Sequence, residues 1–169
     1  MSVVHKINVA VAKYITVKTF VSALIGMLSG FILLMFNVQY ALLWGVLTFF
    51  ANFVPYIGSL FAVAVPIGLS FIQYHDDPQV PIIIAVLLIV SQQLTGSFLE
   101  PRLLGERLGI SPIMILLSLA FWGYLWGVPG MILSSPLVVS IKIILENIPQ
   151  TRPIARLISN VEPDATETG

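Results

Sequence analysis

The sequence predicts an all-α integral membrane protein built from two through-going helices and two Gly/Pro-broken helical hairpins. Of its 169 residues, 57% are hydrophobic and 9% are charged, and the mean hydropathy is +0.98. Soluble domains carry roughly 25% charged residues, so this composition indicates a chain that resides in a lipid bilayer. The hairpins are predicted from two pairs of short apolar segments. In each pair an uncharged Pro/Gly stretch separates the two segments. Six short membrane helices are the alternative architecture.

Residues 1–18 mix apolar side chains with lysines. Lys6 and Lys13 are seven residues apart and therefore share one helical face. This pattern predicts an amphipathic helix at the membrane surface, although a simple extension of the next helix with snorkelling lysines fits equally well. We expect a transmembrane domain over residues 19–145 and a cytoplasmic tail over residues 146–169.

The first through-going helix is predicted over Thr19 to Phe36. These eighteen uncharged residues would extend about 27 Å, close to the hydrocarbon thickness of a bilayer. Ser22, Gly26 and Gly30 recur every fourth residue within it. A stripe of such small residues allows close helix packing, either within one molecule or between subunits.

The first hairpin is predicted from two apolar arms, residues 40–53 and 59–74, on either side of residues 54–58. The arms hold 14 and 16 residues, fewer than the roughly 17 to 25 that a crossing helix needs. The break carries no charge, which is unusual for a loop in water. Non-helical backbone inside a membrane must be buried in protein or line a cavity.

The second through-going helix is predicted over residues 81–99 and leads into a charged stretch. Glu100, Pro101 and Arg102 follow a polar cluster that includes Gln92 and Gln93. Charge at the end of a membrane helix is costly unless something uses it. Glu100 and Arg102 are therefore candidate gate or ion-coupling residues, and a structural ion pair is the plainer alternative.

The second hairpin repeats the design of the first. Its predicted arms are residues 113–126 and 131–145, the break is Gly127–Gly130, and each hairpin carries a proline in its second arm (Pro66 and Pro136). Paired, interrupted short segments point to the binding site of a secondary transporter. We expect the two tips to face each other around one solute site.

The distribution of charge predicts the orientation. Lysines occur in the first eighteen residues and Lys142, Arg152 and Arg156 near the end, whereas the loop at residues 75–79 is acidic with no Lys or Arg. By the positive-inside rule both termini lie in the cytoplasm and the acidic loop lies outside.

Several motifs together resemble a known family of bacterial membrane transporters. They are Tyr14 with Lys18-Thr19, Trp44-Gly45, the run Asn52–Gly58, the run Phe98–Gly105 with Leu108–Pro112, Phe121–Gly123 and Gly130–Leu137. In order and spacing they resemble the autoinducer-2 exporter family. The resemblance implies export of a small polar solute across the bacterial inner membrane, autoinducer-2 in the best-known case, and a homo-oligomer. Members are typically about twice this length, so the chain corresponds to a C-terminal half.

Candidate site residues follow from these patterns. The predicted substrate path contains polar or break residues of the hairpins and of the second span: Asn52, Pro55, Tyr56, Gly58, Gln92, Gln93, Ser134 and Ser135. Interhelical hydrogen bonding is the alternative role for the glutamines. Predicted packing residues are Ser22, Gly26 and Gly30.

Other function classes find little support in the sequence. It has no HExxH, GxSxG or P-loop motif and no cysteine, and it contains no basic block, so we expect neither an enzyme, a metal or cofactor site, nor a nucleic-acid partner. The resemblance implies a solute exporter or, on the same scaffold, a sodium/proton antiporter with sodium or a proton as partner. A non-transporting module for membrane assembly is the third alternative.

Overall fold

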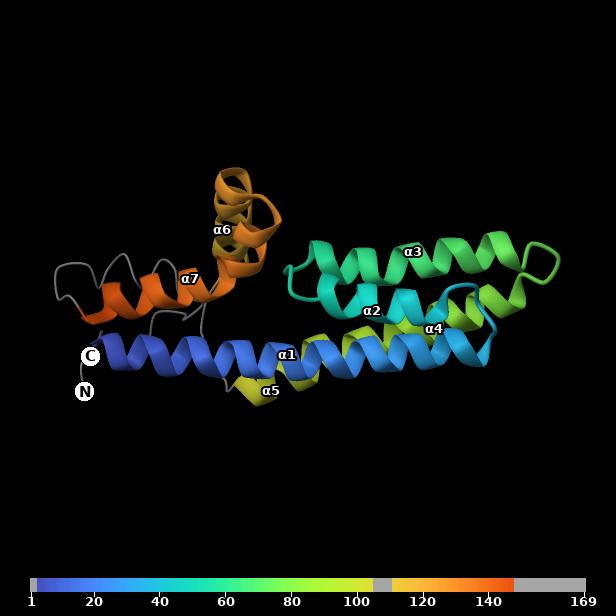
Figure 1. The fold of residues 1–169 in the computed structure, drawn as a ribbon, viewed down its shortest axis with the longest axis horizontal. Coiled ribbons are helices and arrows are strands. Elements are labelled where there is room, and N and C mark those ends of the chain that lie inside the picture. The colour runs from blue at the N-terminus through green and yellow to red at the C-terminus, as the bar shows by residue number, and fades with distance from the viewer. Residues whose placement is uncertain (1–2, 105–110, 148–169) are drawn as a thin grey trace, which may run out of the picture. The chain divides into compact units, whose positions relative to one another are not determined.

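The computed structural model describes residues 3–104 and 111–147, and every regular element within these ranges is a helix (Figure 1). The predicted all-α class is confirmed. Three of the described helices are long and apolar enough to cross a membrane: Val3–Met35, Gln79–Leu104 and Val128–Glu146. The tail predicted over residues 146–169 lies almost wholly outside the described residues.

Contacts divide the chain into two compact units. The first-hairpin unit is Tyr14–Gly105, and the second-hairpin unit is Met1–Lys13 with Glu106–Gly169. Helix α1 (Val3–Met35) is continuous across the boundary between them. No proline interrupts α1, which explains why the predicted surface helix and the first span form one element. A surface position for residues 1–18 stays a prediction.

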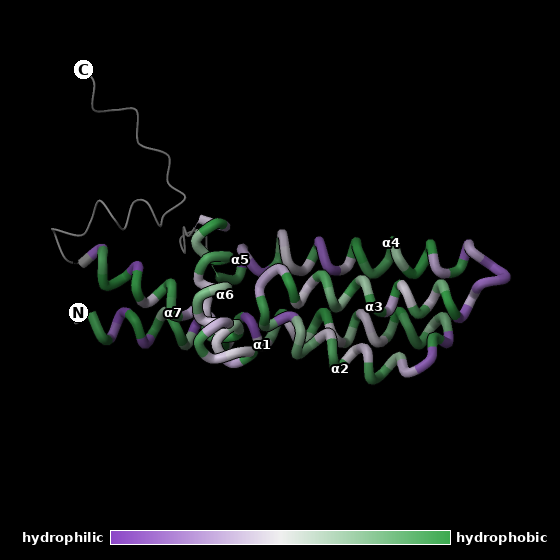
Figure 2. The backbone as a smooth tube through the Cα atoms, turned by 90° about the horizontal axis from the view of Figure 1, so that it is seen from above, coloured by the Kyte–Doolittle hydropathy of each residue, from purple (hydrophilic) through white to green (hydrophobic). Residues whose placement is uncertain are grey.

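The first-hairpin unit is a bundle of elongated helices (Figures 1 and 2). The hairpin is α2 (Ala41–Ala51) and α3 (Ile57–Gln73), and α4 (Gln79–Gln93) packs against α3. Helix α4 continues without a break through the π-helix η1 (Leu94–Leu99) into the short helix α5 (Glu100–Leu104). Figure 2 shows mainly hydrophobic residues along the helices of this unit and hydrophilic residues at the α1–α2 and α3–α4 turns.

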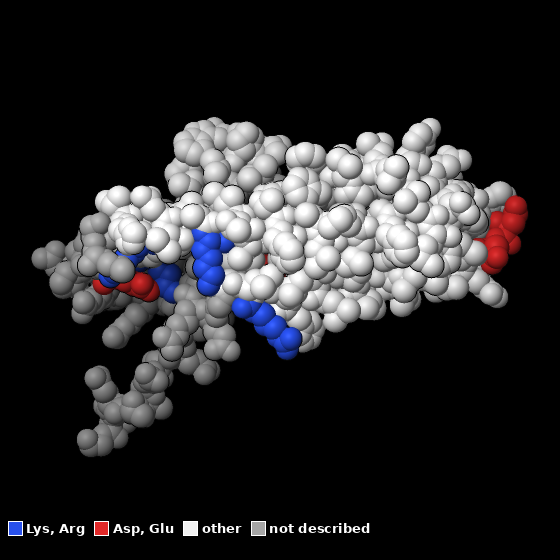
Figure 3. All heavy atoms as spheres, turned by 60° about the horizontal axis from the view of Figure 1, so that its bottom comes forward, with Lys and Arg blue, Asp and Glu red and all other residues white. Residues whose placement is uncertain are grey.

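An apolar core occupies one end of this unit. Its buried members come from α1, the α1–α2 turn, α2 and α4: Ile32, Leu33, Val38, Ala41, Ile84 and Leu88. The end of α3 is tied to the α1–α2 turn, because Tyr74 donates its hydroxyl to the carbonyl of Phe36 and Gln73 bonds Asn37 and Gln39. The acidic α3–α4 turn lies beyond it and is the red patch at the right-hand end of Figure 3.

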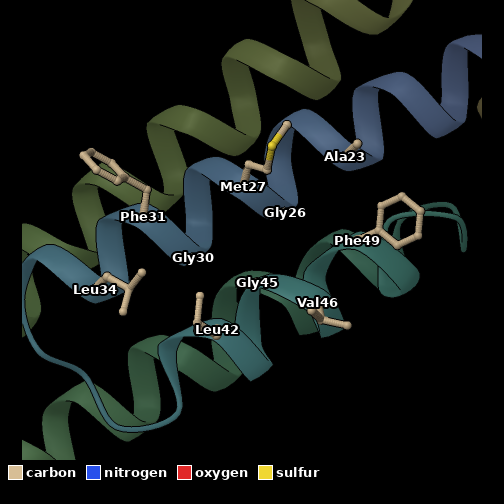
Figure 4. Close-up of a pocket in the computed structure, with 10 residues that line it drawn as sticks. All are labelled: Ala23, Gly26, Met27, Gly30, Phe31, Leu34, Leu42, Gly45, Val46 and Phe49. Carbon is tan, nitrogen blue, oxygen red and sulfur yellow. The ribbon is translucent and has the colours of Figure 1, made fainter.

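Helices α1 and α2 pack through glycines (Figure 4). A Cβ on Gly26 would lie 2.8 Å from the carbonyl oxygen of Gly45, and a Cβ on Gly45 would lie 3.1 Å from the Cα of Gly30. The predicted small-residue stripe therefore faces α2 of the same chain. An apolar groove of about 400 Å³ runs beside this contact, with Phe31 and Leu42 among its walls.

The second hairpin consists of α6 (Pro112–Trp126) and α7 (Val128–Asn147). The break is Gly127 alone, with φ +67°, a conformation that glycine adopts at little cost. Pro129 lies in the first turn of α7, where a helix needs no backbone N–H. The predicted break over 127–130 and the 15-residue second arm are therefore wrong, because α7 has 20 residues.

Candidate functional site

A buried polar cluster lies in the first-hairpin unit between α1, the end of α2 and α4. Asn52 follows the last residue of α2, and its side-chain Nδ2 donates to the Ser22 hydroxyl at 3.0 Å. Its Oδ1 accepts a longer bond, 3.5 Å, from Nε2 of Gln92. Ser22 is 0% exposed and Asn52 is 6% exposed. The structure thus joins two predicted path residues, Asn52 and Gln92, and adds Ser22 to them.

Three buried polar atoms of α2 and α4 have no hydrogen-bond partner within the described part of the chain. They are Gln92 Oε1, Thr48 Oγ1 and Trp44 Nε1. Trp44 and Thr48 precede Asn52 by eight and four residues, so the three side chains share one face of α2. We call Ser22, Thr48, Asn52 and Gln92 the polar cluster; Trp44 lies one turn beyond it, against the apolar core.

The free hydroxyl of Thr48 contrasts with other hydroxyls of the same unit. Ser70, Ser91 and Thr95 each donate to a carbonyl of their own helix, at 2.7 to 2.9 Å. This local bond is the usual solution for Ser and Thr inside a helix. Thr48 does not make it although the residue is only 1% exposed. Its hydroxyl, like the side-chain carbonyl of Gln92, therefore has no hydrogen-bond partner among the described residues.

A buried ion pair lies near the polar cluster. The Lys18 ammonium donates to both carboxylate oxygens of Glu100, at 2.8 and 2.9 Å, and the two side chains are 8% and 17% exposed. Arg102 is exposed, and no ion pair joins it to another described residue. Residues two apart on a helix point in different directions, which explains why Glu100 meets Lys18 rather than Arg102.

The remaining path residues of this unit lie outside the polar cluster. Gln93 is exposed and accepts a bond of 3.4 Å from the Ser97 hydroxyl. Pro55 and Tyr56 lie in the hairpin break, and Gly58 lies in the first turn of α3. Tyr56 is 48% exposed and has φ +59°, a conformation that costs a non-glycine residue energy. A Cβ on Gly58 would lie 1.6 Å from the Ala51 carbonyl oxygen, so only glycine fits there.

Ser134 and Ser135 are buried in the second-hairpin unit, at 0% and 8% exposure. The Ser134 hydroxyl donates to the Met131 carbonyl at 2.7 Å, and its own carbonyl accepts from the Ser118 hydroxyl at 3.1 Å. The first bond lies within α7, and the second links α6 to α7. A common site for these serines and the polar cluster stays a prediction.

Sequence reasoning missed Lys18, Thr48 and Trp44 as site residues. The four-residue spacing of Trp44, Thr48 and Asn52 could have revealed the polar face of α2. No local signal could pair Lys18 with Glu100, because 82 residues separate them. In the described ranges no group of three or more His, Cys, Asp or Glu side chains could hold a metal ion.

Comparison with known proteins gives one consistent result. The model of the AI-2E family transporters matches residues 1–150. The chain is 34% identical over 164 residues to the Escherichia coli protein named AI-2 transport protein TqsA, which covers 97% of this chain and 47% of that protein. It is 39% identical over 142 residues to a Borreliella burgdorferi protein whose name proposes a role in transport, covering 84% of this chain and 39% of that protein. The chain thus spans less than half the length of these curated relatives.

Proposed function

Because this chain belongs to the AI-2E family of transporters, we propose that it forms the solute-binding part of a secondary transporter for a small polar solute. Export of autoinducer-2 across the bacterial inner membrane is the specific activity proposed, since the Escherichia coli relative is named for AI-2 transport. We further propose that both termini lie in the cytoplasm and that the protein works as a homo-oligomer.

The polar cluster carries this proposal. An unpaired polar atom in an apolar interior costs roughly 1 to 3 kcal/mol by protein mutational data, so a chain that leaves several together gains by binding a polar molecule there. Within the cluster Thr48 offers a hydroxyl and Gln92 a carbonyl, and Trp44, one turn away on α2, carries an unpaired N–H group. This mixture of donors and acceptors suits a hydroxylated neutral solute.

The experiment removes the Thr48 hydroxyl without changing the shape of its side chain. Thr48→Val should lower the release of autoinducer-2 from expressing cells about tenfold, which corresponds to roughly 1.4 kcal/mol. Thr95→Val is the matched control, because that hydroxyl already bonds the Ser91 carbonyl. Equal release by Thr48→Val and the unchanged protein would remove the polar cluster from the path.

Sodium/proton antiport is the second candidate, favoured by the buried carboxylate of Glu100. In proteoliposomes it predicts a change of internal pH on addition of sodium, abolished by Glu100→Gln. No pH change with the unchanged protein would exclude this function. A folded oligomer that carries neither solute nor ions would instead favour a membrane-assembly role.

A further inference from the structure

The π-helix η1 sets the direction of the Glu100 side chain. It covers six residues, Leu94–Leu99, and the backbone N–H of Glu100 bonds the carbonyl of Thr95, five residues before it. An α-helix would use the carbonyl of Gly96, four residues before it. A π-helical segment therefore behaves as an α-helix that accommodates one extra residue, and such segments occur frequently at functional sites.

Rewinding this segment as an α-helix would move Glu100 away from Lys18. Each residue of an α-helix advances about 100° around the axis. Removal of the bulge turns everything after it by about that angle. Leu99 would then take the angular position that Glu100 holds now, and the carboxylate would leave the ammonium.

Little packing in the π-helix opposes such a rotation. Thr95 is its one buried residue, while Leu94 and Phe98 are 57% and 56% exposed. A Cβ on Gly96 would meet nothing within 4 Å. Pro101, directly after Glu100, has no N–H, so α-helical winding gains no hydrogen bond at that residue. The two windings therefore differ mainly in whether Glu100 meets Lys18.

We propose that Lys18 is a positioning residue for Glu100 and that residues 94–99 switch between two registers. In the π register Glu100 is buried against Lys18, and in the α register it is released. Lys18 lies one turn before Ser22 on α1, and Glu100 lies eight residues after Gln92. The switch thus acts on α1 and α4, two of the three helices that carry the polar cluster, and its role in admitting solute rests on the proposed function.

The first test moves the carboxylate by one residue. Glu100→Leu alone leaves the Lys18 ammonium buried without its partner and should lower the melting temperature in detergent by about 10 °C. The double variant Leu99→Glu with Glu100→Leu can restore the pair only in the α register. We expect the melting temperature of the double variant to return most of the way to that of the unchanged protein. A double variant as unstable as Glu100→Leu would overturn the two-register proposal.

The second test fixes residues 94–99 in a single register and keeps the Lys18–Glu100 ion pair. Deletion of Gly96 makes Thr95 the residue four before Glu100, so the same backbone bond becomes α-helical and Glu100 stays on Lys18. We expect an unchanged melting temperature and loss of autoinducer-2 release. Full release by this deletion variant would refute the role of the switch while leaving the proposed function intact. If the unchanged protein releases no autoinducer-2, the proposed function fails, and the melting temperatures of the first test still decide the two registers.

Discussion

At the scale of single residues, Lys18 and Glu100 form a buried ion pair in the first-hairpin unit. Both carboxylate oxygens accept a bond from one ammonium, and both side chains are mostly buried. Bringing two charges out of water is expensive, and their attraction offsets that cost only while both are present. The pair therefore specifies how α1 meets the end of α4 more than it adds stability.

This reasoning predicts a large energetic coupling between the two residues. Lys18→Met should lower the free energy of unfolding by about 3 to 5 kcal/mol, because it leaves a buried carboxylate unpaired. The double variant Lys18→Met with Glu100→Leu should lie within about 1 kcal/mol of the unchanged protein, since it buries no charge. Denaturant titration in mixed detergent micelles measures the unfolding free energies of Lys18→Met, of Glu100→Leu and of the double variant. If the loss of unfolding free energy in the double variant equals the sum of the losses in the two single variants, the two side chains do not interact.

At the scale of elements, glycines decide how closely helices approach. Gly26 and Gly45 bring the backbones of α1 and α2 into contact, and Gly58 and Gly130 perform a similar task within the two hairpins. A Cβ on Gly130 would lie 1.9 Å from the Trp122 carbonyl oxygen. Both hairpins therefore place a glycine of the second arm against a carbonyl of the first.

Gly26 and Gly30 provide a matched comparison on one helix face. Gly26→Ala should destabilise the first-hairpin unit by about 1 to 3 kcal/mol, because its Cβ would overlap the Gly45 carbonyl oxygen. Gly30→Ala should be tolerated, since its nearest neighbour lies at an ordinary contact distance of 3.5 Å. Thermal unfolding in detergent checks both variants, and equal losses would contradict the Gly26–Gly45 contact.

The first hairpin allows a similar comparison. Gly58→Ala should prevent the hairpin from closing, because a Cβ 1.6 Å from the Ala51 carbonyl oxygen requires the backbone to move. Gly68→Ala, inside α3 with nothing within 4 Å, should instead stabilise the helix by up to about 1 kcal/mol. Limited proteolysis at the break and thermal unfolding would separate the two. A stable Gly58→Ala protein with an intact break would refute the close approach.

At the scale of the whole molecule, helix length limits the possible arrangements in a membrane. Helices α2, α3 and α6 are shorter than the helices that meet the length of a crossing, whereas α7 meets it. The two hairpins are therefore not equivalent in length, although the sequence makes them look alike. Helix α7 carries Pro136 inside it, and Figure 1 shows that α7 bends along its course.

A labelling experiment tests whether the first break lies within the bilayer. The chain has no cysteine, so Tyr56→Cys and Asp76→Cys each introduce a single thiol. We expect a membrane-impermeant maleimide to label Asp76→Cys from outside intact cells and to leave Tyr56→Cys unlabelled. Equal labelling from either side would place the break in water and favour six short crossings.

The sequence by itself determined the class of this protein and the approximate limits of its helices. Composition alone requires a bilayer, because so few charges cannot cover a soluble surface. Breaks at Pro55 and Gly127 follow from local backbone chemistry, and the polar residues Asn52 and Gln92 are visible as exceptions in apolar runs. Such properties depend on neighbouring residues in the chain, and pattern reasoning reaches them.

Only the tertiary structure decided which polar groups meet. It paired Glu100 with Lys18 instead of Arg102, joined Asn52 to Ser22 and Gln92, and left the Thr48 hydroxyl without a partner. The physical reason is that these contacts depend on helix rotation and on the distance between helix axes. The π-helix at residues 94–99 sets the rotation of Glu100 about its helix axis, and the Gly26–Gly45 contact sets the distance between α1 and α2. The spacing of polar residues along one helix reveals neither.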